Sequence, residues 1–261
     1  MKSASGSWMG DYPRACTTLI CLASLSDHEK TDSRRGAHAG IYGVSDHADL
    51  SHLCDCAVVQ VLERVRRLRR EVRFLTELRF LPLRVALFQW RAWRLAWRAE
   101  DGFSPLSRTP PRKLAVLLSA AGSRRRIVEL GTGTAWTAIS LVLADSGREV
   151  LSYDPIQRPE RERYLRLISP ETRRRLTFVS ASGDEGPRDG ETVGLLYVDS
   201  SHDREDTIRE IETWRPVLKE GSLVVFDDFG NPEYPGVEEA VRQLGLEGNE
   251  RCGLFVHRVS A

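Results

Sequence analysis

Three aspartates follow two apolar segments of the chain and are the residues whose spacing most clearly suggests chemistry. Asp199 comes directly after residues 195–198, and Asp227 and Asp228 come directly after residues 222–226. If the two segments are neighbouring strands of a parallel sheet, their carboxyl ends face one crevice. Carboxylates that meet there repel one another, and a divalent cation such as Mg²⁺ relieves that repulsion. The spacing therefore favours a metal site. The alternative is that one acid binds a cofactor, another caps a helix, and no metal is bound.

A glycine-containing turn follows a third apolar segment, residues 126–130. The turn reads Glu129-Leu-Gly131-Thr-Gly133-Thr134. Paired glycines let the backbone turn tightly and approach a ligand, and the helix N-terminus behind them favours a carboxylate. Glu129 would bind the ammonium group of S-adenosylmethionine but would repel a dinucleotide pyrophosphate, and Thr134 stands where dinucleotide turns have a third glycine. The turn favours S-adenosylmethionine, with a surface acid at Glu129 as the alternative.

Two further positions complete the predicted cofactor site. Asp154 ends the next apolar segment, where a carboxylate accepts hydrogen bonds from ribose hydroxyls, unless it only shapes the turn before Pro155. Ser182 follows the segment after that, where an adenine ring would lie, and either Ser182 or Asp184 is a candidate to bond the adenine amino group. This second signal is weak, because serine, glycine and aspartate fill loops for purely local reasons.

His202 is the candidate base for methyl transfer, which is an in-line displacement from a sulfonium carbon. The acceptor oxygen must lose its proton and be aligned with that carbon. A metal ion that binds two neighbouring acceptor oxygens would lower the pKa of one and orient it. His202 lies three residues after Asp199 in the same loop and titrates in the range needed to take the proton. The alternative is a loop histidine that hydrogen-bonds the backbone.

Alternating strands and helices must position these residues. Short apolar segments separated by helical patterns predict a doubly wound, mostly parallel α/β sheet covered on both faces. We expect strands at residues 126–130, 149–153, 176–180, 195–198, 222–226 and 254–259, and helices at residues 113–121, 135–144, 159–168, 204–218 and 237–244.

The N-terminal part of the chain has a different character. Residues 1–50 have no sustained period and are expected to form a disordered tail, whereas residues 51–105 predict a basic amphipathic helical extension or lid. Pro82 divides the extension into two helices, the second at residues 83–99. Eleven arginines and three glutamates lie within residues 57–98, and Trp90, Trp93 and Trp97 are spaced for one helical face. We favour packing of tryptophan and leucine on the main domain over a surface for an anionic partner.

Composition limits the protein classes that need to be considered. The 261 residues carry a formal net charge of only +1, which argues against a general nucleic-acid binder, and no apolar stretch is long enough to span a membrane. The odd cysteine count suits no disulfide framework and favours a reducing, cytoplasmic location. His52, Cys54 and Cys56 are too tightly spaced for a usual zinc site and are interpreted as incidental.

Two segments carry a resemblance to a known family. The turn at residues 129–134 and the segment LLYVDSSHDREDTIREIETWRPVLKEGSLVVFDDF resemble class I S-adenosylmethionine-dependent methyltransferases, and within them the metal-dependent sugar, macrolide and catechol O-methyltransferases. The resemblance implies a seven-stranded, Rossmann-like methyltransferase domain over residues 110–261. It places Asp199, Asp227 and Asp228 on the family's metal ligands and His202 where the catechol enzymes have a catalytic lysine. Ser201 departs from the acid that sugar-modifying relatives often use as base.

These observations together predict a methyltransferase with a small-molecule acceptor, sugar-like or phenolic. Glu129, Gly131, Gly133, Asp154 and Ser182 would bind S-adenosylmethionine. Mg²⁺ or another divalent cation would be bound by the three aspartates. The alternatives are an NAD(P)-binding oxidoreductase, or a methyltransferase-fold module that binds a membrane or nucleic acid through residues 57–98.

Overall fold

The protein is described by a computed structural model that covers residues 62, 64–66, 68, 69 and 71–260. The predicted tail, the start of the basic extension, and His52, Cys54 and Cys56 lie outside these residues. Residues 71–77 are helical and run into a short 3-10 helix, Leu78–Phe80. In the described part of the chain, no helix is long and apolar enough to cross a bilayer.

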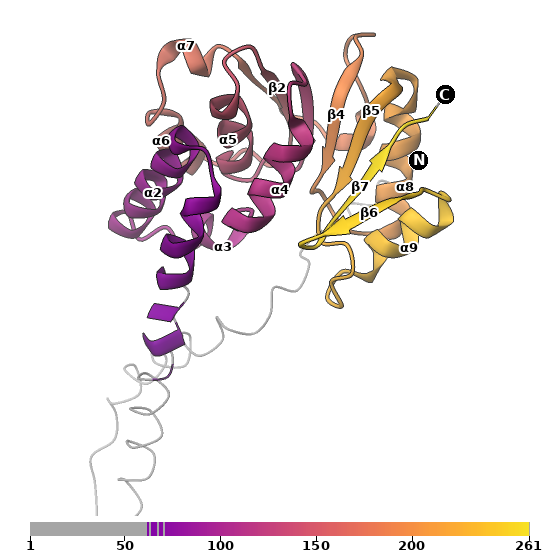
Figure 1. The fold of residues 1–261 in the computed structure, drawn as a ribbon. Helices are drawn as coiled ribbons and strands as arrows, with labels where there is room; N and C mark the ends of the chain where they lie inside the picture. Colours follow the sequence, from indigo (N-terminus) through magenta and orange to yellow (C-terminus); the bar gives the residue numbers. More distant parts are fainter. Residues whose placement is uncertain (1–61, 63, 67, 70, 261) are drawn as a thin grey trace, which may run out of the picture. The chain divides into compact units, whose positions relative to one another are not determined.

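Seven strands form one sheet, as the family resemblance implied (Figure 1). Its order is β3-β2-β1-β4-β5-β7-β6. Strands β1 to β5 pair in parallel, and the C-terminal hairpin adds two antiparallel strands beside β5. The strands are β1 (Arg126–Leu130), β2 (Glu149–Tyr153), β3 (Leu176–Val179), β4 (Val193–Val198), β5 (Leu218–Phe226), β6 (Gly248–Arg251) and β7 (Leu254–Arg258).

Helices cover both faces of this sheet, which is the doubly wound arrangement that the sequence predicts. One face packs against α2, α4 and α5, and the other packs against α8 and α9. The helices are α2 (Leu83–Arg98), α3 (Ser104–Ser107), α4 (Pro111–Ala121), α5 (Trp136–Ala144), α6 (Glu160–Leu165), α7 (Pro170–Arg173), α8 (Arg204–Trp214) and α9 (Pro235–Gln243).

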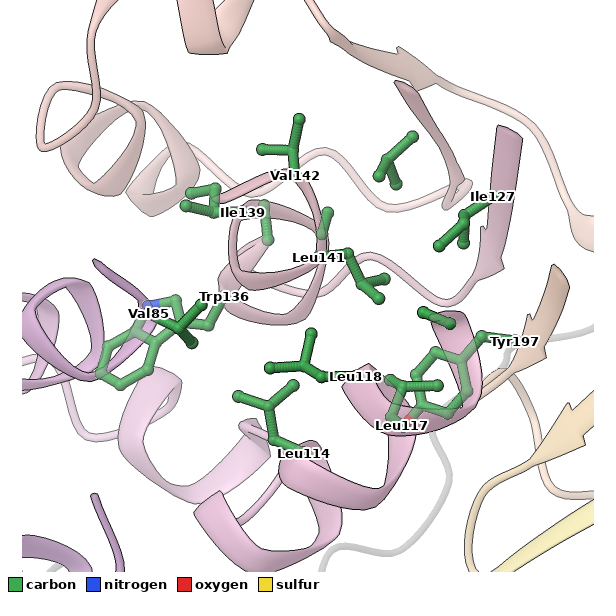
Figure 2. Packing of buried hydrophobic residues seen from close by; sticks show 14 of the residues in the cluster. Val85, Leu114, Leu117, Leu118, Ile127, Trp136, Ile139, Leu141, Val142 and Tyr197 are labelled. Atoms are coloured by element: carbon green, nitrogen blue, oxygen red, sulfur yellow. The ribbon is translucent and has the colours of Figure 1, made fainter. Parts of the chain in front are cut away.

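The alternation of side chains along each strand divides the core into two clusters. On β4, Leu195 and Tyr197 join the cluster on the α4 and α5 face, whereas Leu196 and Val198 join the cluster on the α8 and α9 face. Figure 2 shows Tyr197 beside Leu117, among the side chains that α4 and α5 contribute to the first cluster. The face of each strand residue therefore decides which helix it meets, and this decides the partners of the polar residues beyond the strand ends.

The second helix of the basic extension packs into the same core as the sheet. Its buried face carries Val85, Phe88, Ala92 and Ala96, and Gln89 donates a 2.9 Å hydrogen bond to Ser140 on α5. The expectation that the three tryptophans form the packed face is therefore wrong for two of them. Trp93 is partly buried against the core, but Trp90 and Trp97 are more than a third exposed. The small residues Ala92 and Ala96 lie fully buried on the packed face of α2 instead.

Other differences from the predicted elements occur at ends and edges. The helix predicted at residues 204–218 ends at Trp214, because a 3-10 turn at Arg215–Val217 leads directly into a longer β5. The helix predicted at residues 159–168 is shorter, Glu160–Leu165, and a separate short helix that was not predicted, α7, begins at Pro170. Strand β6 was not predicted, because all four of its residues are exposed and it carries no apolar alternation.

Candidate active site

Asp199 and Asp227 lie one step beyond the hydrogen-bonded ends of β4 and β5. The Asp199 amide donates to the Leu130 carbonyl at 2.8 Å, and the Asp227 amide donates to the Val198 carbonyl at 2.9 Å. The extended backbone thus continues to both aspartates, and side chains two residues apart share a face. Asp199 shares its face with Tyr197, and Asp227 shares its face with Val225, so both carboxylates point to the side covered by α4.

The α4 side of this crevice carries a lysine that the sequence did not single out. Lys113 Nζ lies 2.5 Å from Asp227 Oδ1 and 2.9 Å from Asp228 Oδ1, and the lysine side chain is only 14% exposed. Burial by itself would lower the pKa of Lys113, but the carboxylates of Asp227 and then Asp228 raise it overall. The lysine therefore carries a positive charge between two of the three predicted metal ligands.

Tyr197 lies beneath the carboxylates and links two of them. Its hydroxyl donates to Asp227 Oδ2 at 2.9 Å and lies 3.3 Å from Asp199 Oδ2. Thr109 Oγ1 is 3.4 Å away on the other side of the hydroxyl. Burial, together with the negative charges of Asp199 and Asp227, raises the pKa of Tyr197 well above its usual value. The hydroxyl therefore stays protonated and donates its one proton to Asp227, the nearer of the two acids.

His202 lies beside two of the three carboxylates, and its side chain is 17% exposed. Its Nε2 is 3.4 Å from Asp199 Oδ1 and 3.5 Å from Asp228 Oδ2, and its ring stacks on Tyr234 with centroids 4.6 Å apart. Its backbone adopts φ +60°, a conformation that non-glycine residues seldom occupy. Burial lowers the pKa of His202, but Asp199 and Asp228 raise it by more. The structure thus brings His202 and the three aspartates together, as the predicted site requires.

Glu129 is buried at the end of β1, so its interpretation as a surface acid is wrong. The residue is 1% exposed, and Ser152 on the neighbouring strand donates a short hydrogen bond to its Oε2. Its other oxygen, Oε1, has no hydrogen-bond partner among the described residues. Burial raises the pKa of Glu129 to about 8. A buried carboxylate with one free acceptor oxygen fits a cationic ligand group such as an ammonium.

The turn after Glu129 is shaped for close approach. Gly131 has φ +98°, and a Cβ there would lie 1.8 Å from the Asp199 carbonyl oxygen, so only glycine fits. Gly133 has φ +51°, and no described atom lies within 4 Å of where its Cβ would be. Ala135 is also left-handed, at φ +68°, and precedes the first turn of α5. The backbone therefore leaves open space beside Gly133 at the start of a helix.

Asp154 connects this turn to the end of β2. Its Oδ2 accepts the Gly133 amide at 2.9 Å, and its Oδ1 accepts the Ile156 amide at 2.8 Å. Arg161 lies 3.6 Å from the same carboxylate and donates to the Gly133 carbonyl at 3.0 Å. Asp154 therefore holds the glycine turn in place, and each carboxylate oxygen retains a lone pair for a ligand hydroxyl.

Ser182 has a local role in the structure. Its side chain caps a 3-10 helix, Gly183–Glu185, in a capping box with Glu185. Beside it, a Cβ on Gly183 would lie 2.4 Å from Oε1 of Glu210, which is 3% exposed. Burial raises the pKa of Glu210 to about 7, and Ser200 donates to its other oxygen at 2.7 Å. Ser182 as an adenine contact stays a prediction, whereas Asp184 is exposed and lies 3.7 Å from Arg209.

The oxygen donors expected to bind Mg²⁺ are present, but their surroundings do not fit the ion. A divalent cation needs several oxygens at about 2.0–2.6 Å from one point. Here the Lys113 ammonium already bonds Asp227 and Asp228, and it would repel a second cation between them. Within the described ranges, no group of three or more His, Cys, Asp or Glu side chains is arranged to hold a metal ion.

Sequence reasoning missed Lys113, Tyr197 and Arg161. Tyr197 had a usable signal, because it stands two residues before Asp199 and strand alternation puts both on one face. Lys113 and Arg161 had none, since each reaches the site from a helix remote in sequence from the residues that it binds.

Comparison with known proteins gives one family match. Residues 128–229 match a family model described as a methyltransferase domain. This range runs from β1 to the residue after Asp228, and so it contains the glycine turn, Asp154 and all three aspartates of the cluster. No curated protein matches the chain.

Several solved structures are similar to this chain at low sequence identity. A protein from Corynebacterium glutamicum is 14% identical, with 66% of this chain and 88% of that chain covered and a TM-score of 0.50. The apo structure of CalS11, a TDP-rhamnose 3'-O-methyltransferase of calicheamicin biosynthesis, is 18% identical, with 65% and 93% covered and a TM-score of 0.47. The O-methyltransferase NovP is 16% identical, with 58% and 81% covered and a TM-score of 0.43.

Proposed function

Because residues 128–229 match a methyltransferase domain, we propose that the chain is a class I S-adenosylmethionine-dependent methyltransferase that methylates a hydroxyl oxygen of a small molecule. We propose oxygen as the methylated atom because His202, three aspartates and Lys113 form a cluster beyond β4 and β5. A hydroxyl must lose its proton as it is methylated, so its site needs a group that takes a proton. A molecule with neighbouring hydroxyls, sugar-like or phenolic, is the acceptor class proposed.

The cofactor would be bound by the turn between β1 and α5 and by the end of β2. Glu129 Oε1 would accept the ammonium group, the space beside Gly133 would admit the methionine part, and Asp154 would accept ribose hydroxyls. Ser182 would lie beside the adenine. When bound, S-adenosylmethionine supplies the methyl group: the bond from carbon to sulfur breaks with its electrons on sulfur, and the acceptor oxygen forms the new bond to carbon.

His202 would act as the base. Its Nε2 would take the acceptor proton and pass it to water, while the carboxylates of Asp199 and Asp228 stabilise the imidazolium that forms. Stacking on Tyr234 fixes the plane of the ring, so that Nε2 keeps its direction. These residues would bind, orient and deprotonate the acceptor.

Calorimetric titration with S-adenosylhomocysteine tests the cofactor assignment. We expect micromolar binding, because product and cofactor share the groups that the turn would recognise. His202→Gln should retain that binding and lose at least about 100-fold in turnover of any acceptor found by screening, as expected for loss of a general base. His257→Gln is the matched control, because His257 is bonded to the Glu247 carbonyl on the β6–β7 hairpin. A folded protein that does not bind S-adenosylhomocysteine would contradict the proposal.

We further propose that the basic extension contacts an anionic lipid surface. The observation that favours this is a group of exposed apolar side chains among its arginines. Val65 is 40% exposed, Leu68 is 60% exposed and Val72 is 52% exposed. Apolar residues flanked by arginine suit the boundary between headgroups and acyl chains.

Sedimentation with vesicles tests this contact. The chain should sediment with phosphatidylserine-containing vesicles at low salt and be released as salt is raised, because attraction to anionic headgroups is screened. The double change Leu68→Asp and Val72→Asp should abolish the binding, whereas Leu106→Asp, at an exposed position on α3, should not. Equal binding to neutral vesicles, or no effect of the double change, would count against it.

A further inference from the structure

The three carboxylates beyond β4 and β5 each have a cationic or donor partner within the protein. Asp227 is paired with Lys113 and accepts from Tyr197. Asp228 is paired with Lys113 and lies near His202. The third acid, Asp199, lies between His202 and Tyr197. The repulsion that led us to predict a divalent cation is therefore reduced by the chain itself at Asp227 and Asp228. At Asp199, burial and the charge of Asp227 still raise the pKa to about 7.

The lysine lies between Asp227 and Asp228, in the place that a metal ion bound through the same two oxygens would take. Its ammonium bonds one oxygen of each adjacent aspartate, and its side chain is 14% exposed. The turn between β6 and β7 passes over it: a Cβ on Gly253 would lie 3.5 Å from Lys113 Cε and 3.7 Å from Nζ. Gly253 has φ +76°, and its carbonyl accepts the Phe229 amide at 3.2 Å, which fixes the turn next to Asp228.

The backbone explains why the lysine reaches the acids. Asp227 shares the strand face of Val225, which packs in the cluster with Leu114 and Leu117 of α4. Lys113 precedes Leu114 and lies one helical turn before Leu117, so its long side chain extends along that cluster to the strand end. The same packing that buries α4 therefore delivers the ammonium to the carboxylates.

We propose that Lys113 is the resident cation of this site and that the protein binds no divalent metal there. A lysine ammonium supplies one positive charge and three donors at the place where a metal would supply two charges and coordination bonds. The consequence for methyl transfer rests on the proposed function: the acceptor oxygen would be oriented by hydrogen bonds from Lys113 and not by coordination to a metal. Lys113 is then a positioning residue for the acids and a candidate contact of the acceptor.

Manganese binding tests the proposal without cofactor or acceptor. The full chain, freed of metal with EDTA, is titrated with Mn²⁺, and the free ion is measured by electron paramagnetic resonance. We expect no bound Mn²⁺ at millimolar concentrations for the wild type and for Lys113→Arg, which keeps the charge. Lys113→Met should bind one Mn²⁺ at least tenfold more tightly, because three carboxylates then converge with no cation between Asp227 and Asp228.

Two controls separate the possible outcomes. Lys219→Met removes a lysine that bonds the Pro216 carbonyl at the surface, and it should leave Mn²⁺ binding as in the wild type. Wild-type binding of one Mn²⁺ that is lost in Asp227→Asn would overturn the proposal, and this result does not depend on the folding of any lysine variant. A folded Lys113→Met protein that binds no Mn²⁺ would also overturn it. Calorimetry with S-adenosylhomocysteine reports separately on the proposed function.

Discussion

Replacing Glu129 with glutamine should stabilise the ligand-free protein and weaken cofactor binding, and the structure sets the size of the first effect. Burial raises the pKa of Glu129 from 4.5 to about 8. Between these values the folded state holds a proton that the unfolded state has released. Stability therefore falls as pH rises, by about 1.4 kcal/mol per pH unit. At pH 7 the accumulated cost is about 3 kcal/mol, and it grows until the pH passes about 8.

Glutamine keeps the shape of the side chain and has no such titration. Its carbonyl can still accept from Ser152, but its amide group would lie where Glu129 Oε1 has no partner among the described residues, at a cost of about 1–2 kcal/mol. The net gain at pH 7 is therefore about 1–2 kcal/mol. This corresponds to a rise in Tm of roughly 2–8 °C for a domain of this size.

Urea unfolding from pH 5 to pH 8 checks the reasoning directly. The free energy of unfolding of the wild type should fall relative to that of Glu129→Gln as pH rises, and Glu149→Gln, at an exposed position at the start of β2, should follow the wild type. Parallel pH curves for the wild type and Glu129→Gln would refute the assignment of a buried, protonated Glu129.

The raised pKa of Glu129 also predicts that ligand binding is coupled to proton release. An ammonium ligand favours the ionised form of Glu129, so binding of S-adenosylhomocysteine below about pH 8 should release a proton from the wild type. Calorimetry in two buffers of different ionisation enthalpy measures that release. Glu129→Gln should bind more weakly and release none. A variant that binds as tightly as the wild type would show that this carboxylate does not contact the ligand.

The remaining predictions concern the two glycines of the turn. Gly131→Ala should unfold the protein or cost several kcal/mol and abolish S-adenosylhomocysteine binding, because its Cβ would lie 1.8 Å from the Asp199 carbonyl oxygen; unchanged binding and Tm would contradict the turn geometry. Gly133→Ala should cost only about 1–2 kcal/mol, since its Cβ meets no described atom and only the positive φ is unfavourable. It should still weaken ligand binding at least tenfold, measured by calorimetry, because the methyl group would occupy the space assigned to the cofactor. Tight binding by Gly133→Ala would place the cofactor elsewhere.

Much of the fold was predictable because apolar segments are local signals. Strands β1 and β2 begin and end at the predicted residues. Strands β4, β5 and β7 are present where predicted, but their first or last residues differ from the prediction. An edge strand such as β6 lacks the signal, because its residues are exposed on both faces and need no apolar alternation. The tryptophans of α2 were misplaced for a related reason, since spacing predicts that residues share a face but not which face meets the core.

The candidate site divides in the same way between sequence and structure. By itself, the sequence determined the residues that end successive strands, namely Glu129, Asp154, Asp199 and the Asp227–Asp228 pair, because parallel strands bring their ends to one edge. Only the tertiary structure decided what meets them there. The packing of α4 on the sheet places Lys113 beside Asp227 and Asp228. The C-terminal hairpin places Gly253 next to Lys113. A charged partner that tertiary packing brings to a site has no periodic pattern in the sequence. The same three aspartates therefore predicted a metal ion, whereas the structure places the Lys113 ammonium beside two of them.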